Sequence, residues 1–343
     1  MSNPNIAILG ATGVVGGEIL KILEEKSFPF NQIKFLASAR SAGKKIEFKG
    51  ETYTIEEATP EAFEGINIVL ASAGASTSKA LVNEIIKKGA VLVDNSSAFR
   101  MEKDVPLVIA GVNDEDLKWH KGIVANPNCS TSQLMLALKP LHDYGKIKRI
   151  IVSTYQSVSG AGKEAIDDLS EGTQAALNKE QYKYKKFTIK PIAFNLIPQI
   201  DVFCENGYTK EEMKVVEETK KILHLPEETP ITCTAVRVPV FISHSESVSI
   251  ELEKEITPEK AREILSASYG VTVIDNPAKS EYPTPIEAAG KDPVYVGRIR
   301  KDAVFNNGLA LWVVADNLRI GAALNTVRIA EKLVEMDLAR VPN

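Results

Sequence analysis

The stretch Gly10-Ala11-Thr12-Gly13-Val14-Val15-Gly16 does most to decide the fold of this chain. It lies between Asn5–Leu9, an apolar run that predicts a buried strand, and Val14–Glu25, where apolar residues recur at helical spacing. Glycines in this context let the backbone turn sharply and approach a pyrophosphate, and the helix N-terminus offers its N–H groups to the anion. We therefore predict a dinucleotide-binding turn. The residues expected to contact the cofactor there are Gly10, Thr12, Gly13, Val14 and Val15.

Downstream of this turn, short apolar runs alternate with segments of helical length such as Lys79–Lys87. Alternation of this kind is typical of a parallel sheet with helices on its faces. We therefore predict an α/β chain with an N-terminal Rossmann-like dinucleotide-binding domain. The further strands expected in its sheet are Ile33–Ala37, Ile66–Ala71, Val91–Asp94, Leu107–Ile109 and Ile123–Ala125.

The pattern changes after about residue 145, where apolar and polar residues begin to alternate along short runs. Such alternation predicts a mostly antiparallel sheet with one buried face. The charged and weakly patterned segment Leu177–Lys190 predicts a surface excursion. The strands expected in this part are Ile147–Ser153, Val236–Val240, Glu246–Leu252, Val294–Ile299 and Leu309–Val314.

The chain ends in a helical pattern from Ile320 to Val334, which we expect to pack back on the first domain. A chain of 343 residues is too long for one compact core. We therefore expect two domains. The first comprises residues 1–130 with the C-terminal helix, residues 318–343, and the second is an α+β domain over residues 131–317.

Composition excludes several classes of function. The chain is 44% hydrophobic and 25% charged, with a net charge of −4, which is ordinary for a soluble globular protein and implies no strongly basic surface. Neither nucleic acid nor a membrane is therefore an expected partner. The N-terminus resembles no signal peptide. Three irregularly spaced cysteines and four scattered histidines predict no disulfide framework and no metal site, and they favour a cytoplasmic location.

The end of the second predicted strand favours NADP over NAD. An acidic residue is expected there when the cofactor is NAD, because it binds the ribose 2′-hydroxyl. The chain instead reads Ala37-Ser38-Ala39-Arg40-Ser41, and Ser38, Arg40 and Ser41 are suited to a 2′-phosphate. A second turn of small residues follows the third strand, and Ser72 and Gly74 in it are expected to lie along the nucleotide.

The segment Asn126-Pro127-Asn128-Cys129-Ser130-Thr131 predicts a nucleophile. It follows a predicted strand and precedes an amphipathic helix, so Cys129 is expected at or near a helix N-terminus. The partial positive charge there favours the thiolate. A thiolate attacks an aldehyde and survives as a thioester after hydride leaves. Cys204 and Cys233 have no such context and are expected to be inert.

These motifs together resemble the aspartate-semialdehyde dehydrogenase family, whose order they follow from residue 10 to past residue 320. A single motif can arise by chance, whereas an ordered set over nearly the whole chain is highly specific. Besides the glycine turn and the Cys129 segment, the stretches that carry the resemblance are Ser96–Arg100, Tyr155–Gly162, Lys210–Lys214, Arg237–Val240, Ser243–Ser247 and Asp316–Arg319.

The resemblance implies catalytic roles for three residues. Cys129 would form an acyl-enzyme, His244 would act as general acid and base, and Gln156 would contact the substrate and orient the intermediate. An imidazole suits proton transfer near neutral pH, and an amide can donate to an oxyanion without adding charge. The further cofactor contacts that the resemblance implies are Ser159, Gly160 and Asn317.

The resemblance also implies how the substrate is bound. Arg237 would bind its carboxylate and Glu211 its ammonium group, while Arg100 and Lys214 would form a phosphate site. The implied reaction is the reversible, NADPH-dependent reductive dephosphorylation of L-aspartyl 4-phosphate to L-aspartate 4-semialdehyde, in the biosynthesis of diaminopimelate, lysine, threonine and methionine. The second domain would be the catalytic and dimerisation domain of a homodimer.

Three alternatives are weighed against this expectation. N-acetyl-glutamyl phosphate reductases share the cysteine and histidine, but their substrate has no free ammonium for Glu211 to bind. A glyceraldehyde-phosphate-type dehydrogenase is disfavoured because the second strand lacks the acid for NAD. A catalytically silent nucleotide-binding protein would have little reason to keep Cys129, Gln156, Arg237 and His244 together.

Overall fold

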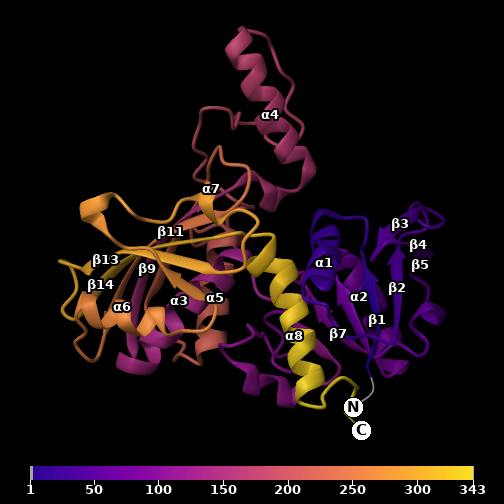
Figure 1. Ribbon diagram of the computed structural model, residues 1–343. Helices are drawn as coiled ribbons and strands as arrows, with labels where there is room; N and C mark the ends of the chain where they lie inside the picture. Colours follow the sequence, from indigo (N-terminus) through magenta and orange to yellow (C-terminus); the bar gives the residue numbers. More distant parts are fainter. Residues whose placement is uncertain (1–2, 343) are drawn as a thin grey trace. The chain divides into compact units, whose positions relative to one another are not determined.

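The computed structural model describes residues 3–342, which form two compact units (Figure 1). The first unit comprises the residues up to Asn128 and those from Ala322 onward, and the second comprises Cys129 to Gly321. Within residues 3–342, no helix is long and apolar enough to cross a membrane.

A parallel sheet forms the centre of the first unit, in the strand order β5-β2-β1-β6-β7-β8. Counted along the chain, this is the order 3-2-1-4-5-6 of dinucleotide-binding sheets. The Rossmann-like domain predicted from the sequence is confirmed. The strands are β1 (Asn5–Leu9), β2 (Gln32–Ala37), β5 (Glu56–Glu57), β6 (Ile68–Ala71), β7 (Val91–Asp94) and β8 (Ile123–Ala125).

The same unit contains three α-helices: α1 (Val14–Glu25), α2 (Ala75–Lys87) and α8 (Leu324–Glu335) (Figure 1). The strands β1, β6 and β7 are buried almost throughout, as continuous apolar runs predict for a sheet covered by helices. The remaining elements of this unit are a hairpin of β3 (Lys45–Phe48) and β4 (Glu51–Thr54) and two 3₁₀ turns, Pro60–Phe63 and Asp114–Trp119.

The C-terminal helix α8 packs against α1, β6 and β7. Its first turn is also tied to the irregular segment after Leu107 by the buried side chain of Asn325, which donates to Val108 O (2.9 Å) and accepts from Ala110 N–H (3.0 Å). These two bonds satisfy buried main-chain groups that would otherwise lose a partner. The end of the chain is thus part of the first unit.

The second unit contains a mixed sheet in the order β10-β9-β11-β14-β13-β12. The central pairs β9–β11, β11–β14 and β14–β13 are antiparallel, and the edge strands β10 and β12 pair in parallel. The predicted α+β class with a mostly antiparallel sheet is confirmed. The strands are β9 (Ile147–Gln156), β10 (Ile231–Arg237), β11 (His244–Leu252), β12 (Val271–Val273), β13 (Val294–Lys301) and β14 (Gly308–Ala315).

Helices α3 (Cys129–Gly145), α5 (Lys210–Leu223) and α6 (Pro258–Ser266) pack against this sheet. Helix α4 (Lys163–Asn178) stands away from it (Figure 1). Short elements complete the description: α7 (Pro285–Ala288), the 3₁₀ turns Val158–Ala161 and Pro277–Lys279, and a π-helical turn over Arg319–Ala323 that leads into α8.

The predicted surface excursion Leu177–Lys190 begins inside α4, a helix that the sequence pattern did not predict. The irregular chain after α4 is held by the buried carboxylate of Asp168, which accepts from the main-chain N–H groups of Lys185 (2.8 Å), Lys186 (2.7 Å) and Phe187 (2.9 Å). These hydrogen bonds satisfy main-chain N–H groups that have no neighbouring strand to bond with.

Two predicted strands were wrong in detail. Leu107–Ile109 forms only an isolated bridge, from Leu107 to Ala125. The alternating run Val236–Val240 lies mostly beyond β10, which ends at Arg237. Pro239 has no N–H to offer a neighbouring strand, so the ladder stops before it.

Candidate active site

Cys129 is the first residue of α3, so the helix start predicted for it is confirmed. Its side chain is partly buried, and its Sγ lies 3.2 Å from Nε2 of His244. Gly321 lies directly against it, because a Cβ at position 321 would be 2.6 Å from the Cβ of Cys129. The helix N-terminus favours the thiolate, and the glycine allows the close approach.

His244 is the first residue of β11, and its side chain is fully buried. Its Nδ1 lies 3.1 Å from both the main-chain N and the Oγ of Ser157. Burial, together with the nearby charge of Arg237, holds the pKa of His244 well below its usual 6.5. The imidazole is therefore neutral near pH 7.

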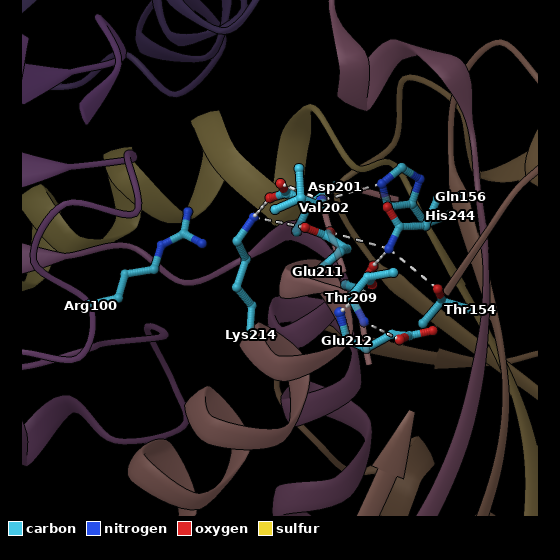
Figure 2. Close-up of polar contacts among 12 residues, drawn as sticks. Arg100, Thr154, Gln156, Asp201, Val202, Thr209, Glu211, Glu212, Lys214 and His244 are labelled. Atoms are coloured by element: carbon cyan, nitrogen blue, oxygen red, sulfur yellow. Dashed lines mark hydrogen bonds and ion pairs between the residues drawn. The ribbon is translucent and has the colours of Figure 1, made fainter. Parts of the chain in front are cut away.

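Gln156 is the last residue of β9 and is buried. Its Nε2 lies 2.9 Å from Ser130 Oγ and 3.3 Å from both Thr154 Oγ1 and Glu211 Oε1 (Figure 2). The amide therefore joins the sheet to α3 and to α5.

Arg237 is the last residue of β10, directly opposite Gln156 in the parallel pairing. Its buried Nη1 donates to the carbonyl oxygen of Ser157 over 2.7 Å. Burial lowers the pKa of Arg237, and the charges of Glu211 and Cys129 act in the opposite direction. A guanidinium remains charged under these conditions and presents a planar array of donors.

Glu211 and Glu212 are neighbours on α5 with different surroundings (Figure 2). Glu212 belongs to a capping box with Thr209 and also accepts from Ala235 N–H over 2.9 Å. Glu211 instead contacts Gln156 and pairs with Lys214 over 3.0 Å. Because Glu212 caps the helix, only Glu211 faces the site. The positions of the two residues in the sequence do not distinguish these roles.

Lys214 is partly buried between two carboxylates, those of Glu211 (3.0 Å) and Asp201 (3.1 Å) (Figure 2). Burial lowers the pKa of Lys214, but the two carboxylates outweigh it and raise the pKa above the ordinary value. Lys214 is therefore a fixed cation and not an exposed lysine on a charged helix.

Asn317, Ser159 and Gly160 also lie beside His244. The Oδ1 of Asn317 accepts from Ser157 Oγ (3.0 Å), Ser159 Oγ (3.2 Å) and the N–H of Ser243 (2.9 Å). A Cβ at Gly160 would lie 3.3 Å from Cε1 and Nε2 of His244. These residues pack around the imidazole of the second unit.

In the first unit, the predicted dinucleotide-binding residues gather at the carboxyl ends of β1, β2 and β6. Gly10 has a φ of +92°, and a Cβ there would lie 3.0 Å from backbone atoms of Ser72 and Ala73. Gly13 and Gly74 are the N-caps of α1 and α2, and within the described residues neither helix has a side-chain cap bond. The two helix starts therefore present main-chain N–H groups at this edge.

The remaining predicted cofactor residues line the same turns. Thr12, Val14, Ser38 and Arg40 are exposed, and Val15 is partly exposed. Ser41 is buried, and its N–H donates to Ser38 O over 2.8 Å, which closes the turn that carries Arg40.

Arg100 also belongs to the first unit and is buried. Its Nε donates to Asn126 O over 2.9 Å, and its Nη2 donates to Asn95 O over 2.8 Å. Asn126 is in turn bonded to Asn95 (2.9 Å) and to Asn325 on α8 (2.5 Å). The guanidinium is thereby fixed to the turn that precedes Cys129.

Sequence reasoning missed four residues of this site: Ser130, Ser157, Gly321 and Glu246. The contacts of Ser130, Ser157 and Gly321 are not apparent from the sequence, because they form only when distant elements pack together. Glu246 lies two residues after His244 on β11 and is fully buried, and burial raises its pKa well above 4.5. Cys233, expected to be inert, is buried, whereas Cys204 is partly exposed.

Comparison with family models matches both units. A model described as semialdehyde dehydrogenase, NAD binding domain, matches residues 5–120. A second, described as semialdehyde dehydrogenase, dimerisation domain, matches residues 138–320.

Relatives named aspartate-semialdehyde dehydrogenase match over nearly their whole length. An aspartate-semialdehyde dehydrogenase of Aquifex aeolicus is 56% identical over 337 residues, which are 97% of this chain and 98% of the relative. One of Bacillus subtilis is 50% identical over 341 residues, again 97% of this chain and 98% of the relative.

Solved structures of aspartate-semialdehyde dehydrogenases resemble this chain over nearly its whole length. Aspartate semialdehyde dehydrogenase II of Vibrio cholerae, complexed with ASA, is 44% identical with a TM-score of 0.94 over 98% of this chain and 99% of that one. The enzyme of Candida albicans with NADP is 26% identical with a TM-score of 0.78 over 98% of this chain and 100% of that one.

Proposed function

This chain belongs to the aspartate-semialdehyde dehydrogenase family of oxidoreductases, and from that premise we propose its detailed reaction. We propose that it catalyses the reversible NADPH-dependent reductive dephosphorylation of L-aspartyl 4-phosphate to L-aspartate 4-semialdehyde through a thioester on Cys129. The observation that carries this proposal is the 3.2 Å approach of Cys129 Sγ to His244 Nε2 at the start of α3.

Acyl transfer comes first in the biosynthetic direction. The Cys129 thiolate attacks the acyl phosphate, the C–O bond to phosphate breaks, and a thioester forms. The helix N-terminus and the buried charge of Arg237 favour the thiolate. Gln156 offers an N–H to the carbonyl oxygen, and His244 handles the proton of the hemithioacetal formed in the second step.

Charges around Cys129 suit an amino acid substrate. Arg237 binds the α-carboxylate through its buried guanidinium, and Glu211 binds the α-ammonium group. Lys214, which two carboxylates hold as a cation, and Arg100 are the residues proposed to bind phosphate. A substrate without a free ammonium, such as N-acetyl-glutamyl phosphate, would leave the carboxylate of Glu211 less well neutralised.

The cofactor proposed for the first unit is NADP, which when bound supplies the hydride. The fit rests on the positive φ and close packing of Gly10 and on the two helix starts at Gly13 and Gly74. Ser38, Arg40 and Ser41 would hold the 2′-phosphate, since the loop offers a cation and no acid. Ser159, Gly160 and Asn317 are the further residues proposed to contact the cofactor.

We assign cofactor binding to the first domain, residues 1–130 with 318–343, and catalysis and dimerisation to residues 131–317. The protein would work as a cytoplasmic homodimer in the biosynthesis of diaminopimelate, lysine, threonine and methionine. A family model for a dimerisation domain supports the dimer.

The test is phosphate-dependent reduction of NADP⁺ by L-aspartate 4-semialdehyde, with NAD⁺ and N-acetyl-glutamate semialdehyde as parallel substrates. Strong activity with the first pair alone is expected. Preference for the acetylated aldehyde would overturn the roles given to Glu211 and Arg237. The variant Cys129→Ala should bind NADP⁺ and show no turnover, and turnover retained by it would overturn the thioester.

A further inference from the structure

The cation proposed to bind phosphate is already paired with a carboxylate outside the predicted site. The Nζ of Lys214 lies 3.1 Å from Oδ2 of Asp201 and 3.0 Å from Oε2 of Glu211 (Figure 2). Asp201 belongs to the irregular segment before α5, and no sequence motif singles it out. An ammonium group has three N–H donors, and two carboxylates compete for those of Lys214. An incoming phosphate therefore meets a lysine whose positive charge is already neutralised.

The two carboxylates differ in how their charge is compensated. Glu211 is buried, interacts with the charge of Arg237 as well, and is the residue proposed to receive the ammonium group of the substrate. Asp201 is exposed, and the cations that act on it are Lys214, in direct contact, and Lys210, at longer range. Once the ammonium group is bound, Glu211 has a second partner. Asp201 still competes for Lys214, and its charge repels a phosphate placed there.

The loop holds the carboxylate of Asp201 in this position. Its backbone has a φ of +70°, a left-handed conformation that aspartate and asparagine adopt more readily than most residues. Its Oδ1 accepts from the N–H of Val202 over 2.8 Å, which leaves Oδ2 facing Lys214. The N–H of Lys210 donates to Val202 O over 2.9 Å and ties this loop to the first residue of α5, the helix that carries Lys214. The contact is therefore fixed from both sides.

We propose that Asp201 sets the phosphate affinity of the site, because its carboxylate competes with phosphate for Lys214 and must give way when phosphate binds. This inference rests on the proposed function, in which Lys214 binds phosphate. In the biosynthetic direction the contact favours release of inorganic phosphate after acyl transfer, since Asp201 takes the place of phosphate on Lys214. In the reverse direction it raises the phosphate concentration that the enzyme needs.

The sign of one substitution separates this role from a purely orienting one. Asp201→Asn removes the charge, tolerates the positive φ and can still accept from the N–H of Val202. Loss of a competing charge lowers the KM for phosphate, whereas loss of a contact that only orients Lys214 raises it. We expect a KM for phosphate about two- to fivefold lower, the range of an ion pair with one exposed partner, and an unchanged KM for NADP⁺.

Two controls show where the effect arises. Asp143→Asn removes an exposed negative charge of the same unit, paired with Lys139 over 2.6 Å, and should leave the KM for phosphate unchanged. In the Lys214→Met background, Asp201→Asn should have no further effect, because its influence passes through Lys214. An unchanged or higher KM for phosphate in Asp201→Asn, or the full decrease in the absence of Lys214, would overturn the proposal.

A measurement without turnover separates this inference from the proposed reaction. Acetic anhydride acetylates Lys214 in the intact protein, and peptide mass spectrometry gives the concentration of inorganic phosphate that halves the labelling rate. Asp201→Asn should need about two- to fivefold less phosphate than wild type. That shift in a protein unable to oxidise L-aspartate 4-semialdehyde would refute the reaction alone. Equal concentrations for both proteins, in an active enzyme, would refute the role of Asp201 alone. Failure of phosphate to protect Lys214 in either protein would refute the phosphate site and this inference together.

Discussion

Gly321→Ala tests the packing around Cys129 quantitatively. A Cβ at position 321 would lie 2.6 Å from the Cβ and 2.9 Å from the Cα of Cys129. Carbon atoms in contact are normally about 3.5–4.0 Å apart, so the nucleophile or the 321 turn must move by about 1 Å. A displacement of about 1 Å can cost about 100-fold in rate. Overpacking should also lower the free energy of unfolding by about 1–3 kcal/mol.

The assay compares kcat/KM for L-aspartate 4-semialdehyde with thermal unfolding of the same preparation. Gly17→Ala is the matched control, because a Cβ there meets no atom within 4 Å, and at this exposed position of α1 alanine favours the helix by about 0.5–1 kcal/mol. We expect the control to keep its activity and to be more stable than wild type by about 0.5–1 kcal/mol. Wild-type kcat/KM in Gly321→Ala would refute the reasoning that this contact fixes Cys129.

Three further predictions concern charge. Lys214→Met should raise the KM for phosphate about tenfold or more, because one charge-assisted hydrogen bond contributes about 1.5–3 kcal/mol. The KM for NADP⁺ should not change, and initial rates at varied phosphate and varied NADP⁺ measure both constants. Arg40→Ala should raise the KM for NADP⁺ about tenfold and leave that for NAD⁺ unchanged, and equal changes for both cofactors would refute the 2′-phosphate contact. Burial raises the pKa of Glu246 in the folded state, so folding favours the protonated carboxyl. In the unfolded chain this group ionises near about pH 4.3, and wild type therefore loses stability as the pH rises above that value. Glu246→Gln should therefore match wild type near pH 4 and be more stable by about 1–3 kcal/mol near pH 8, as measured by denaturant unfolding at both pH values.

Much of the fold could be predicted because the continuous apolar runs and the glycine turn are compatible with few other folds. The bounds of β1, α1, β7 and β8 agree with the sequence pattern to the residue. The errors arose where tertiary contacts decide. The predicted strand at Leu107–Ile109 is apolar but forms a single bridge, and the chain after α4 is organised by the buried carboxylate of Asp168, whose partners are distant in sequence.

The residue types of the candidate site could be proposed from the sequence, whereas their geometry could not. The structure brings Cys129, His244, Gln156 and Arg237 together at the ends of α3, β11, β9 and β10. It also distinguishes Glu211 from its neighbour in the chain, which caps the helix.

The most direct measurement of the central claim is a phosphate-free single turnover with L-aspartate 4-semialdehyde and NADP⁺. Without phosphate to release the acyl group, we expect a burst of about one NADPH per site and an aspartyl adduct on the peptide that contains Cys129. Absence of both from a preparation that turns over with phosphate, or an adduct that persists in Cys129→Ala, would contradict the thioester mechanism.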